Sequence, residues 1–169
     1  VIASADPVAQ DADSILLSPS AGHWMGTDNL GRDLWSRIAH GAQVSLGVGF
    51  LSIALGSLVG GLAGLVGGYY GRWADAVLQQ VLDALMSFPT LVLALGIVAI
   101  LGASATNVVV AIALVQAPRV ARVVRSQALA VRSMEYVAAS RLIGAGSVHV
   151  MVRHVLPHCL APFIVIFTS

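Results

Sequence analysis

Residues 44–68 read VSLGVGFLSIALGSLVGGLAGLVGG and contain no charged side chain, and residues 84–118 contain none either. A helix needs roughly 20 apolar residues to cross the hydrocarbon core of a bilayer. The first stretch therefore predicts one membrane-spanning helix, and the second is long enough for nearly two. The small and polar run GASATN at 102–107 favours a tight turn. We therefore expect further spans at 85–101 and 107–124.

The composition agrees with a membrane protein. Hydrophobic residues make up 57% of the 169 residues, charged residues 10%, and the mean hydropathy is +0.87. Soluble domains carry about 25% charged residues, so a fold with so few charges needs lipid as part of its solvent. We expect an all-α, polytopic transmembrane helical bundle. A last apolar run from Val155 to Ser169 is short for a crossing, and the first forty residues lack an apolar core, so the bundle is expected to be incomplete.

The basic residues are distributed unevenly. All nine are arginines, and six lie within 119–158 beside a single acid, Glu135. The segment up to residue 43 has five aspartates and two arginines. Cytoplasmic loops of membrane proteins are enriched in basic residues. This bias predicts that 119–158 and the loop 67–83 are cytoplasmic and that the N-terminal segment is outside. The net charge of +1 does not point to a nucleic-acid partner.

A patterned polar stretch, EYVAASRLIGAGSVHVMVRHVLP, occupies 135–157. A helix over 131–143 is expected to end at Gly144, followed by a second amphipathic stretch at 148–156. Pro157 then stands where a new membrane helix could start. Three side chains share one stripe of the first helix: Tyr136, Ala139 and Ile143. Such a protrusion, with its small alanine face, suits docking into a groove on another protein.

The run Ala138-Ala139, Gly144 and Leu156-Pro157 resembles the EAA loop of bacterial ATP-binding-cassette importer permeases. That motif has Glu-Ala-Ala, three residues, Gly, and a spacer ending in Ile-x-Leu-Pro. Val137 is taken to stand where the motif has its Glu. The resemblance implies an ATPase-docking loop built from the following residues: Glu135, Tyr136, Ala138, Ala139, Gly144, Leu156 and Pro157.

A second stretch, HWMGTDNLGRDLWSRIAHGAQVSL at 23–46, resembles the GTDxLGRDxxSRxxxGxRxSL signature of the dipeptide, oligopeptide and nickel permeases, in the C-type subunit. Gln43 stands where that family often has Arg. The residues at the centre of this signature are Gly26, Thr27, Asp28, Gly31, Arg32 and Asp33. The resemblance implies four parts: an extracytoplasmic segment at 1–43, three transmembrane helices in 44–124, a cytoplasmic coupling loop at 125–157, and the start of a further transmembrane helix at 158–169.

The same resemblance implies a permease subunit of an ATP-driven importer, forming half of the pathway for dipeptides or oligopeptides. Its expected partners are a second homologous permease, two ATPase subunits, an extracytoplasmic solute-binding protein and the lipid of the bacterial inner membrane, which the chain would cross several times. No GxxxxGK[ST] phosphate loop is present, so ATP and Mg are expected on the partner ATPase. Glutathione, nickel and haem remain open as other substrates of this family.

Two other classes of function would make different demands on the sequence. An intramembrane enzyme or metalloprotease would use His149, His154 and His158, but Pro157 lies between two of them and no acid completes a ligand set, so interfacial histidines are the expectation. An autonomous channel or secondary transporter would need polar or broken spans. We expect no catalytic, cofactor-binding or metal-binding residues.

Four further features have structural interpretations. The group Asp28, Arg32 and Asp33 is expected to form a local salt-bridged structure rather than an acid–base site. Asp83 and Pro89 flank the third span, and Asp83 is expected at a helix start, where an acid suits the dipole. Cys159 is expected to be a small packed residue. Gly56, Gly60 and Gly64 form two GxxxG pairs, which indicate close helix packing either within the chain or against a partner permease.

Overall fold

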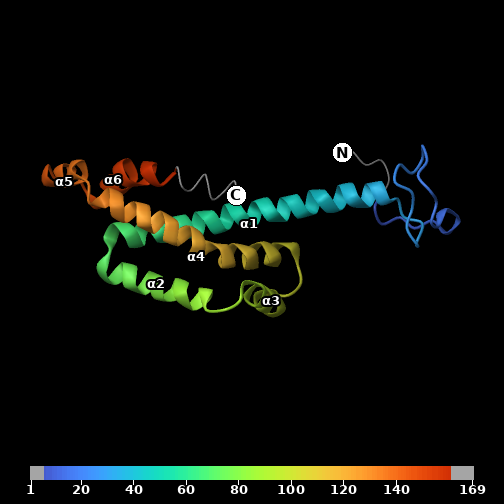
Figure 1. Cartoon of the computed structure of the whole chain (residues 1–169), viewed down its shortest axis with the longest axis horizontal. Helices are drawn as coiled ribbons and strands as arrows, with labels where there is room; N and C mark the ends of the chain where they lie inside the picture. The colour runs from blue at the N-terminus through green and yellow to red at the C-terminus, as the bar shows by residue number, and fades with distance from the viewer. Residues whose placement is uncertain (1–5, 161–169) are drawn as a thin grey trace. The chain divides into compact units, whose positions relative to one another are not determined.

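The chain is described here by a computed structural model that covers residues 6–160. The elements follow in the order η1 (Ala12–Ser14), α1 (Leu34–Tyr70), α2 (Arg72–Met86), α3 (Thr90–Leu101), α4 (Ala105–Arg132), α5 (Glu135–Leu142), α6 (Ser147–Val150) and the π-helical turn η2 (Met151–Val155) (Figure 1). Over 6–160 there is no β-strand, only an isolated bridge between Thr27 and Asp33. The predicted all-α class is confirmed.

The chain divides into two compact units, Val1–Gly49 and Phe50–Ser169, with the boundary inside α1. The first unit holds the folded turns before α1 and the start of that helix. The second holds the remainder of α1 and all later helices.

Within residues 6–160, two helices are long and apolar enough to cross a membrane, α1 and α4. Helices α2 and α3 also qualify together, but their axes differ by 92° at the break between them. The expected span 85–101 is therefore wrong in its boundaries: Leu85 lies in the last turn of α2, and helix resumes only at Thr90. Pro89 explains the break, because its ring has no N–H and disfavours helical geometry at the preceding residue.

The predicted turn between the next two spans is confirmed. Helix α3 ends at Leu101, and Gly102 follows with a φ of +93°. Ser104 caps α4 by accepting a hydrogen bond from the backbone N–H of Asn107 at 3.1 Å. The Asn107 amide also donates to the carbonyl of Leu101 at 2.8 Å, so its side chain ties the two helix ends together.

The glycines of α1 pack within the chain. A methyl group added at Gly56 would lie 2.8 Å from the carbonyl oxygen of Ala113, and methyl groups at Gly60 and Gly64 would press on the carbonyl oxygens of Ala117 and Ala121. The three alanines are buried and stand four residues apart on α4. Two small-residue stripes therefore let the α1 and α4 backbones approach closely. This confirms intrachain packing as a role of the GxxxG pairs.

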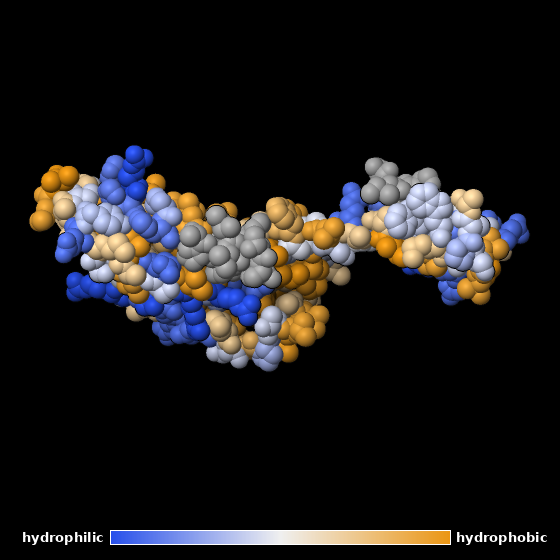
Figure 2. Space-filling model, turned by 45° about the horizontal axis from the view of Figure 1, so that its top comes forward, coloured by the Kyte–Doolittle hydropathy of each residue, from blue (hydrophilic) through white to orange (hydrophobic). Residues whose placement is uncertain are grey.

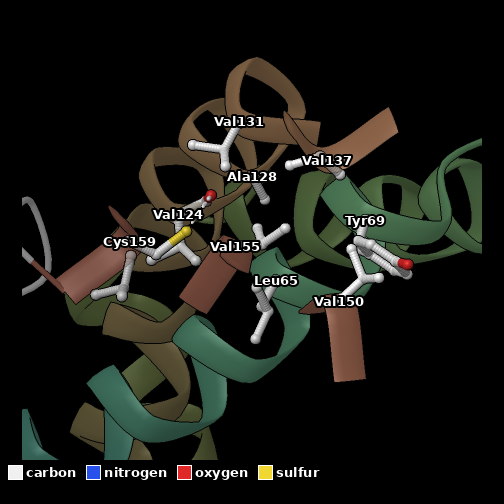
Figure 3. Close-up of a cluster of buried hydrophobic side chains, with 10 residues drawn as sticks. Leu65, Tyr69, Val124, Ala128, Val131, Val137, Val150, Val155 and Cys159 are labelled. Atoms are coloured by element: carbon white, nitrogen blue, oxygen red, sulfur yellow. Dashed lines mark hydrogen bonds between the residues drawn. The ribbon is translucent and has the colours of Figure 1, made fainter. Parts of the chain in front are cut away.

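A hydrophobic core lies where the C-terminal end of α1 packs against α4. Figure 3 shows side chains from α1, α4, α5 and the segment 147–160 converging on one another. The cluster comprises Leu65, Tyr69, Val120, Val124, Ala128, Val131, Val137, Val150, Val155 and Cys159. The Cys159 side chain is buried, as predicted, and its sulfur lies 3.9 Å from the carbonyl oxygen of Val124.

Candidate functional site: the loop after α4 and its neighbours

The predicted glycine turn after the first loop helix is present. Gly144 has a φ of +91°, a conformation that glycine adopts without a steric penalty. Its N–H donates to the carbonyl of Arg141 at 3.0 Å, and the N–H of Ala145 donates to the carbonyl of Ser140 at 3.1 Å. This pair of bonds is the Schellman motif, which satisfies the last carbonyls of α5. The helix boundaries differ from the prediction, because α4 continues to Arg132 and α5 is a separate helix that begins at Glu135.

The predicted docking residues lie mostly on the surface. Those that are exposed are Glu135, Tyr136, Ala138, Ala139, Gly144 and Pro157, while Leu156 is half-buried. The most exposed large apolar groups of the loop are Leu142, 88% exposed, and Ile143, 87% exposed. Sequence reasoning placed Ile143 on the stripe with Tyr136 and Ala139 but missed Leu142. Figure 2 shows apolar surface at the end of the unit where α5 lies. The tip of the protrusion is therefore apolar and uncovered within residues 6–160.

The opposite side of the loop is anchored. Val137, Val150 and Val155 are completely buried in the core beside α4 and the last turn of α1 (Figure 3). Each fully buried valine contributes about 1.5–3 kcal/mol relative to an exposed one. The loop is thus held on its base by buried side chains while its outer face stays open.

The burial of Val137 also corrects the register given to the EAA pattern. Counting three residues back from Gly144 places the triplet over Ala138, Ala139 and Ser140, so Ala138 stands at the position of the motif's Glu. The side chain at position 137 faces the core, so a glutamate at that position could not present its carboxylate to a partner. Ala138 is exposed, as the corrected register requires.

Pro157 does not start a new helix. Helical structure runs from Ser147 through Pro157 to Leu160, with a π-helical turn at Met151–Val155. The Leu156 N–H donates to the carbonyl of Met151, five residues back. Proline has no N–H and clashes with the carbonyl four residues before it. The wider π turn accommodates this, because its hydrogen bonds already skip one residue more than an α-helix.

The histidines meet aromatic and hydroxyl groups on the loop. The His154 ring lies 5.9 Å from that of Tyr136 and 6.1 Å from that of His149, measured between centroids. Its Nε2 is 3.3 Å from the Ser140 hydroxyl oxygen. Across residues 6–160 no three or more His, Cys, Asp or Glu side chains are grouped so that they could hold a metal ion. The histidines thus join α5 to the helical segment that follows it.

Two of the arginines pair with acids of α2. The Arg125 guanidinium forms two hydrogen bonds to the carboxylate of Asp75, and Arg122 Nη2 lies 2.5 Å from Oδ1 of Asp83. These arginines therefore brace α4 against α2, a role beyond the predicted topological one. The position expected for Asp83 was wrong: it lies near the C-terminal end of α2, which begins at Arg72. Its favourable partner is the arginine, since a carboxylate is disfavoured at that end of the dipole.

The signature aspartate Asp28 organises the N-terminal unit. Its carboxylate accepts hydrogen bonds from the backbone N–H groups of Leu30 at 2.8 Å and Arg32 at 3.0 Å, and it pairs with Arg32 Nε at 2.8 Å and with Arg37. Partial burial opposes ionisation, but these bonds outweigh it and lower the pKa of Asp28 to about 2. The predicted local salt-bridged structure is confirmed for Asp28 and Arg32.

Asp33 caps α1. Its carboxylate accepts the backbone N–H of Ser36 at 2.8 Å and lies 3.1 Å from His23 Nδ1. Burial opposes ionisation of Asp33, yet the bonds from Ser36 and the neighbouring His23 lower its pKa. Such an N-cap satisfies a helix N–H group that has no partner within the helix.

The two signature glycines and Thr27 fix the turns before α1. Gly26 and Gly31 have positive φ, +76° and +70°, and an added Cβ at either would collide with the backbone carbonyl of Leu17 or Asp11 respectively. The buried Thr27 hydroxyl bonds to the carbonyl of Ser14 and accepts the N–H of Leu17 at 2.8 Å. All six signature residues thus have structural roles within the first unit.

Together these features define a helical membrane protein with a surface loop fixed on one side and open on the other. Residues 36–169 match the family described as the binding-protein-dependent transport system inner membrane component. This match covers more than half of the chain, and the chain belongs to that family of transport permease subunits.

Proteins with similar sequences agree with this assignment. The chain is 45% identical over 150 residues, 89% of its length, to a permease protein attributed to a peptide transport system of Brucella suis, and covers 50% of that protein. It is 42% identical over 150 residues to the dipeptide transport system permease protein of Alkalihalophilus pseudofirmus, covering 89% of this chain and 49% of that one. Over 158 residues it is 39% identical to the glutathione transport system permease protein of Pectobacterium atrosepticum, covering 94% and 52%. The chain thus spans about half the length of the curated relatives it matches.

Proposed function

We propose that the protein is a permease subunit of an ATP-driven importer for small peptides, and that the loop after α4 transmits the movement of a separate ATPase to the membrane helices. The supporting observation is the two-sided character of the loop. Val137, Val150 and Val155 are buried against α1 and α4, whereas Ala139, Gly144 and the apolar tip at Leu142 and Ile143 are exposed. A force on the tip would therefore reach α4 through packed side chains.

The remaining parts of the proposal follow from the family. A second homologous permease would complete the pathway, two ATPases would bind ATP and Mg on the cytoplasmic face, and a solute-binding protein would deliver substrate from outside. The loop would be cytoplasmic and the unit before α1 extracytoplasmic, which the arginine distribution supports. Small peptides are the proposed substrates because the relatives' names include peptide, dipeptide and glutathione transport.

A bulky side chain on the exposed alanine face tests the docking role. Ala139→Trp in the full-length permease should abolish ATP-driven uptake and the co-purification of the ATPase, because an indole would prevent close approach. Ala130→Trp is the matched control, since Ala130 is also exposed but lies on α4 before the loop. It should retain both activities.

The glycine turn requires its own control. A methyl group added at Gly144 would meet only open space, so Gly144→Ala changes backbone strain with little added bulk, whereas Gly144→Trp adds both. Normal uptake with Trp at positions 139 and 144 would mean that the loop is only a connector and would refute the coupling role. In intact cells, a thiol placed at residue 18 should be labelled from outside and a thiol at residue 140 should not. Labelling at 140 but not at 18 would refute the orientation.

A further inference from the structure

A cavity of about 380 Å³ is lined by residues of α2, α3 and α4 and of the sharp bend between α2 and α3. Binding sites for small molecules are typically about 300–1,000 Å³, with mostly apolar walls and a few polar groups. This cavity fits that description. Its walls include Met86, Phe88 and Leu91, and its polar side chains include Thr90, Gln116 and Arg119.

Arg119 differs from the next two arginines of α4. Arg122 and Arg125 each pair with an acid of α2, whereas the exposed guanidinium of Arg119 forms no ion pair or hydrogen bond with any residue in 6–160. Asp75 and Asp83 are the acids of α2, and both are already engaged. Helix α2 ends at Met86, so at the level of Arg119 the cavity takes the place of a carboxylate partner.

The position of Arg119 along α4 makes an absent partner costly. Arg119 is 14 residues beyond the first residue of α4, which is about 21 Å at 1.5 Å per residue. The hydrocarbon core is roughly 30 Å thick, so an α4 that starts at the far surface carries Arg119 into the half of the membrane nearer the cytoplasm. The cytoplasmic boundary, expected at residue 119, would then lie further along α4. Ionisable groups at such depth usually face a cavity and mark a solute path.

The first turn of α3 lines the same cavity. Its N-cap residue is Pro89, which offers no side-chain acceptor to the N–H groups of that turn. An anion in the cavity would therefore lie beside the first turn of α3, near the positive end of its dipole, in a cavity that Arg119 also lines.

We propose that this cavity binds the carboxylate of the transported peptide, with Arg119 as the cationic group and the apolar walls receiving the rest of the solute. This inference rests on the proposed function, because it takes small peptides as the substrates. A phosphate of an anionic lipid has related chemistry and is the competing occupant.

The test uses the full-length permease assembled with its partners in nanodiscs. Thr90→Cys places a thiol on the cavity wall, and its rate of labelling by a maleimide is measured with increasing Ala-Ala or Ala-Ala amide. The same complex without Thr90→Cys gives the background, since Cys159 is buried.

Ala-Ala should slow the labelling of Thr90→Cys. Adding Arg119→Gln should raise the half-protecting concentration of Ala-Ala about ten-fold or more, the usual effect of losing a charge-assisted hydrogen bond. Arg119→Lys should raise it much less, and Ala-Ala amide should protect poorly in all variants.

Three results would overturn this inference alone. Equal protection by Ala-Ala and its amide, unaffected by Arg119→Gln, would show that no carboxylate is recognised. Protection by phosphatidylglycerol in the nanodisc, with none by Ala-Ala, would assign the cavity to lipid. Absence of protection in a complex that still imports Ala-Ala would remove this site and leave the proposed function intact. A complex that imports no peptide at all would instead refute the proposed function, and this inference with it.

Discussion

Gly60→Ala tests the close contact between α1 and α4. An added methyl group would press on the carbonyl oxygen of Ala117, and it would lie 3.0 Å from both the Ala117 carbonyl carbon and the Val120 Cβ. Ordinary contacts between carbon atoms are about 3.5–4.0 Å. Two of the three neighbours are backbone atoms, which cannot rotate away as a flexible side chain would. The helices must therefore separate locally by about 0.5–1 Å, which forfeits a quarter to a half of the dispersion attraction across the gap.

The free energy follows from two opposing effects. Overpacking of a well-packed contact typically costs about 1–3 kcal/mol. Replacing Gly by Ala in a helix returns up to about 1 kcal/mol of helix propensity. Because the collision involves backbone atoms, the overpacking cost lies in the upper part of its range, about 2–3 kcal/mol. Subtracting about 1 kcal/mol of helix propensity leaves a net destabilisation of about 1–2 kcal/mol, which is a factor of roughly 5–30 in the ratio of folded to unfolded protein.

The measurement is equilibrium unfolding of the full-length permease in mixed micelles. Gly96→Ala is the matched control, because Gly96 lies inside α3 and an added methyl group there meets nothing within 4 Å. Gly96→Ala should be neutral or stabilising, while Gly60→Ala should lower the unfolding midpoint. Equal midpoints for the two variants would refute the claim that the α1 glycines are needed for backbone contact.

Three other predictions follow from the ion pairs and turns. Arg125→Asp should destabilise the permease by facing Asp75 with a second carboxylate, and adding Asp75→Arg should recover most of the loss in the same unfolding assay; failure to recover would deny a direct pair. The pKa of Asp28 is about 2 in the folded protein against an ordinary 3.8, so its stabilising contribution is complete above about pH 4 and is lost as the pH falls toward 2; Asp28→Asn should flatten that part of a proteolysis–pH profile, and an unchanged profile would contradict the assignment. Gly144→Ala should lower the free energy of unfolding by about 1 kcal/mol through backbone strain alone, and an unchanged value would show that the turn tolerates a side chain.

Much of the helical arrangement could be predicted because lipid imposes a strong rule on composition. Charge-free stretches located α1 and α4, and the run before Asn107 located the turn between α3 and α4. The break at Ser87–Pro89 was predicted less well, since hydropathy is continuous across it and only the proline signals a change of direction. The error over Asp83 has the same origin: its surroundings were taken for a helix start because the end of α2 was assigned to the next span.

Contacts between distant segments were the harder part. The GxxxG pattern of α1 indicated a close neighbour, but it could not say which helix supplies it. The alanines at 113, 117 and 121 have the complementary spacing of four and were the available signal. The pairing of Arg125 with Asp75 joins residues 50 positions apart, so no local pattern reveals it. The register of the coupling loop, by contrast, could be counted from the three-residue spacing before Gly144, and the burial of Val137 agrees with that count.

Pro118 lies inside α4, completely buried and directly before Arg119. Having no N–H, it leaves the carbonyl of Leu114 without its usual helical donor, so α4 is braced less firmly here than elsewhere. The α4 residues that line the cavity lie on both sides of Pro118, with Gln116 before it and Arg119 after it. The hydrophobic core that anchors the loop contacts α4 only after Pro118, from Val120 onward. A helix bends most easily where a hydrogen bond is missing. A tilt of the loop end would therefore bend α4 at Pro118 and widen or narrow the cavity there.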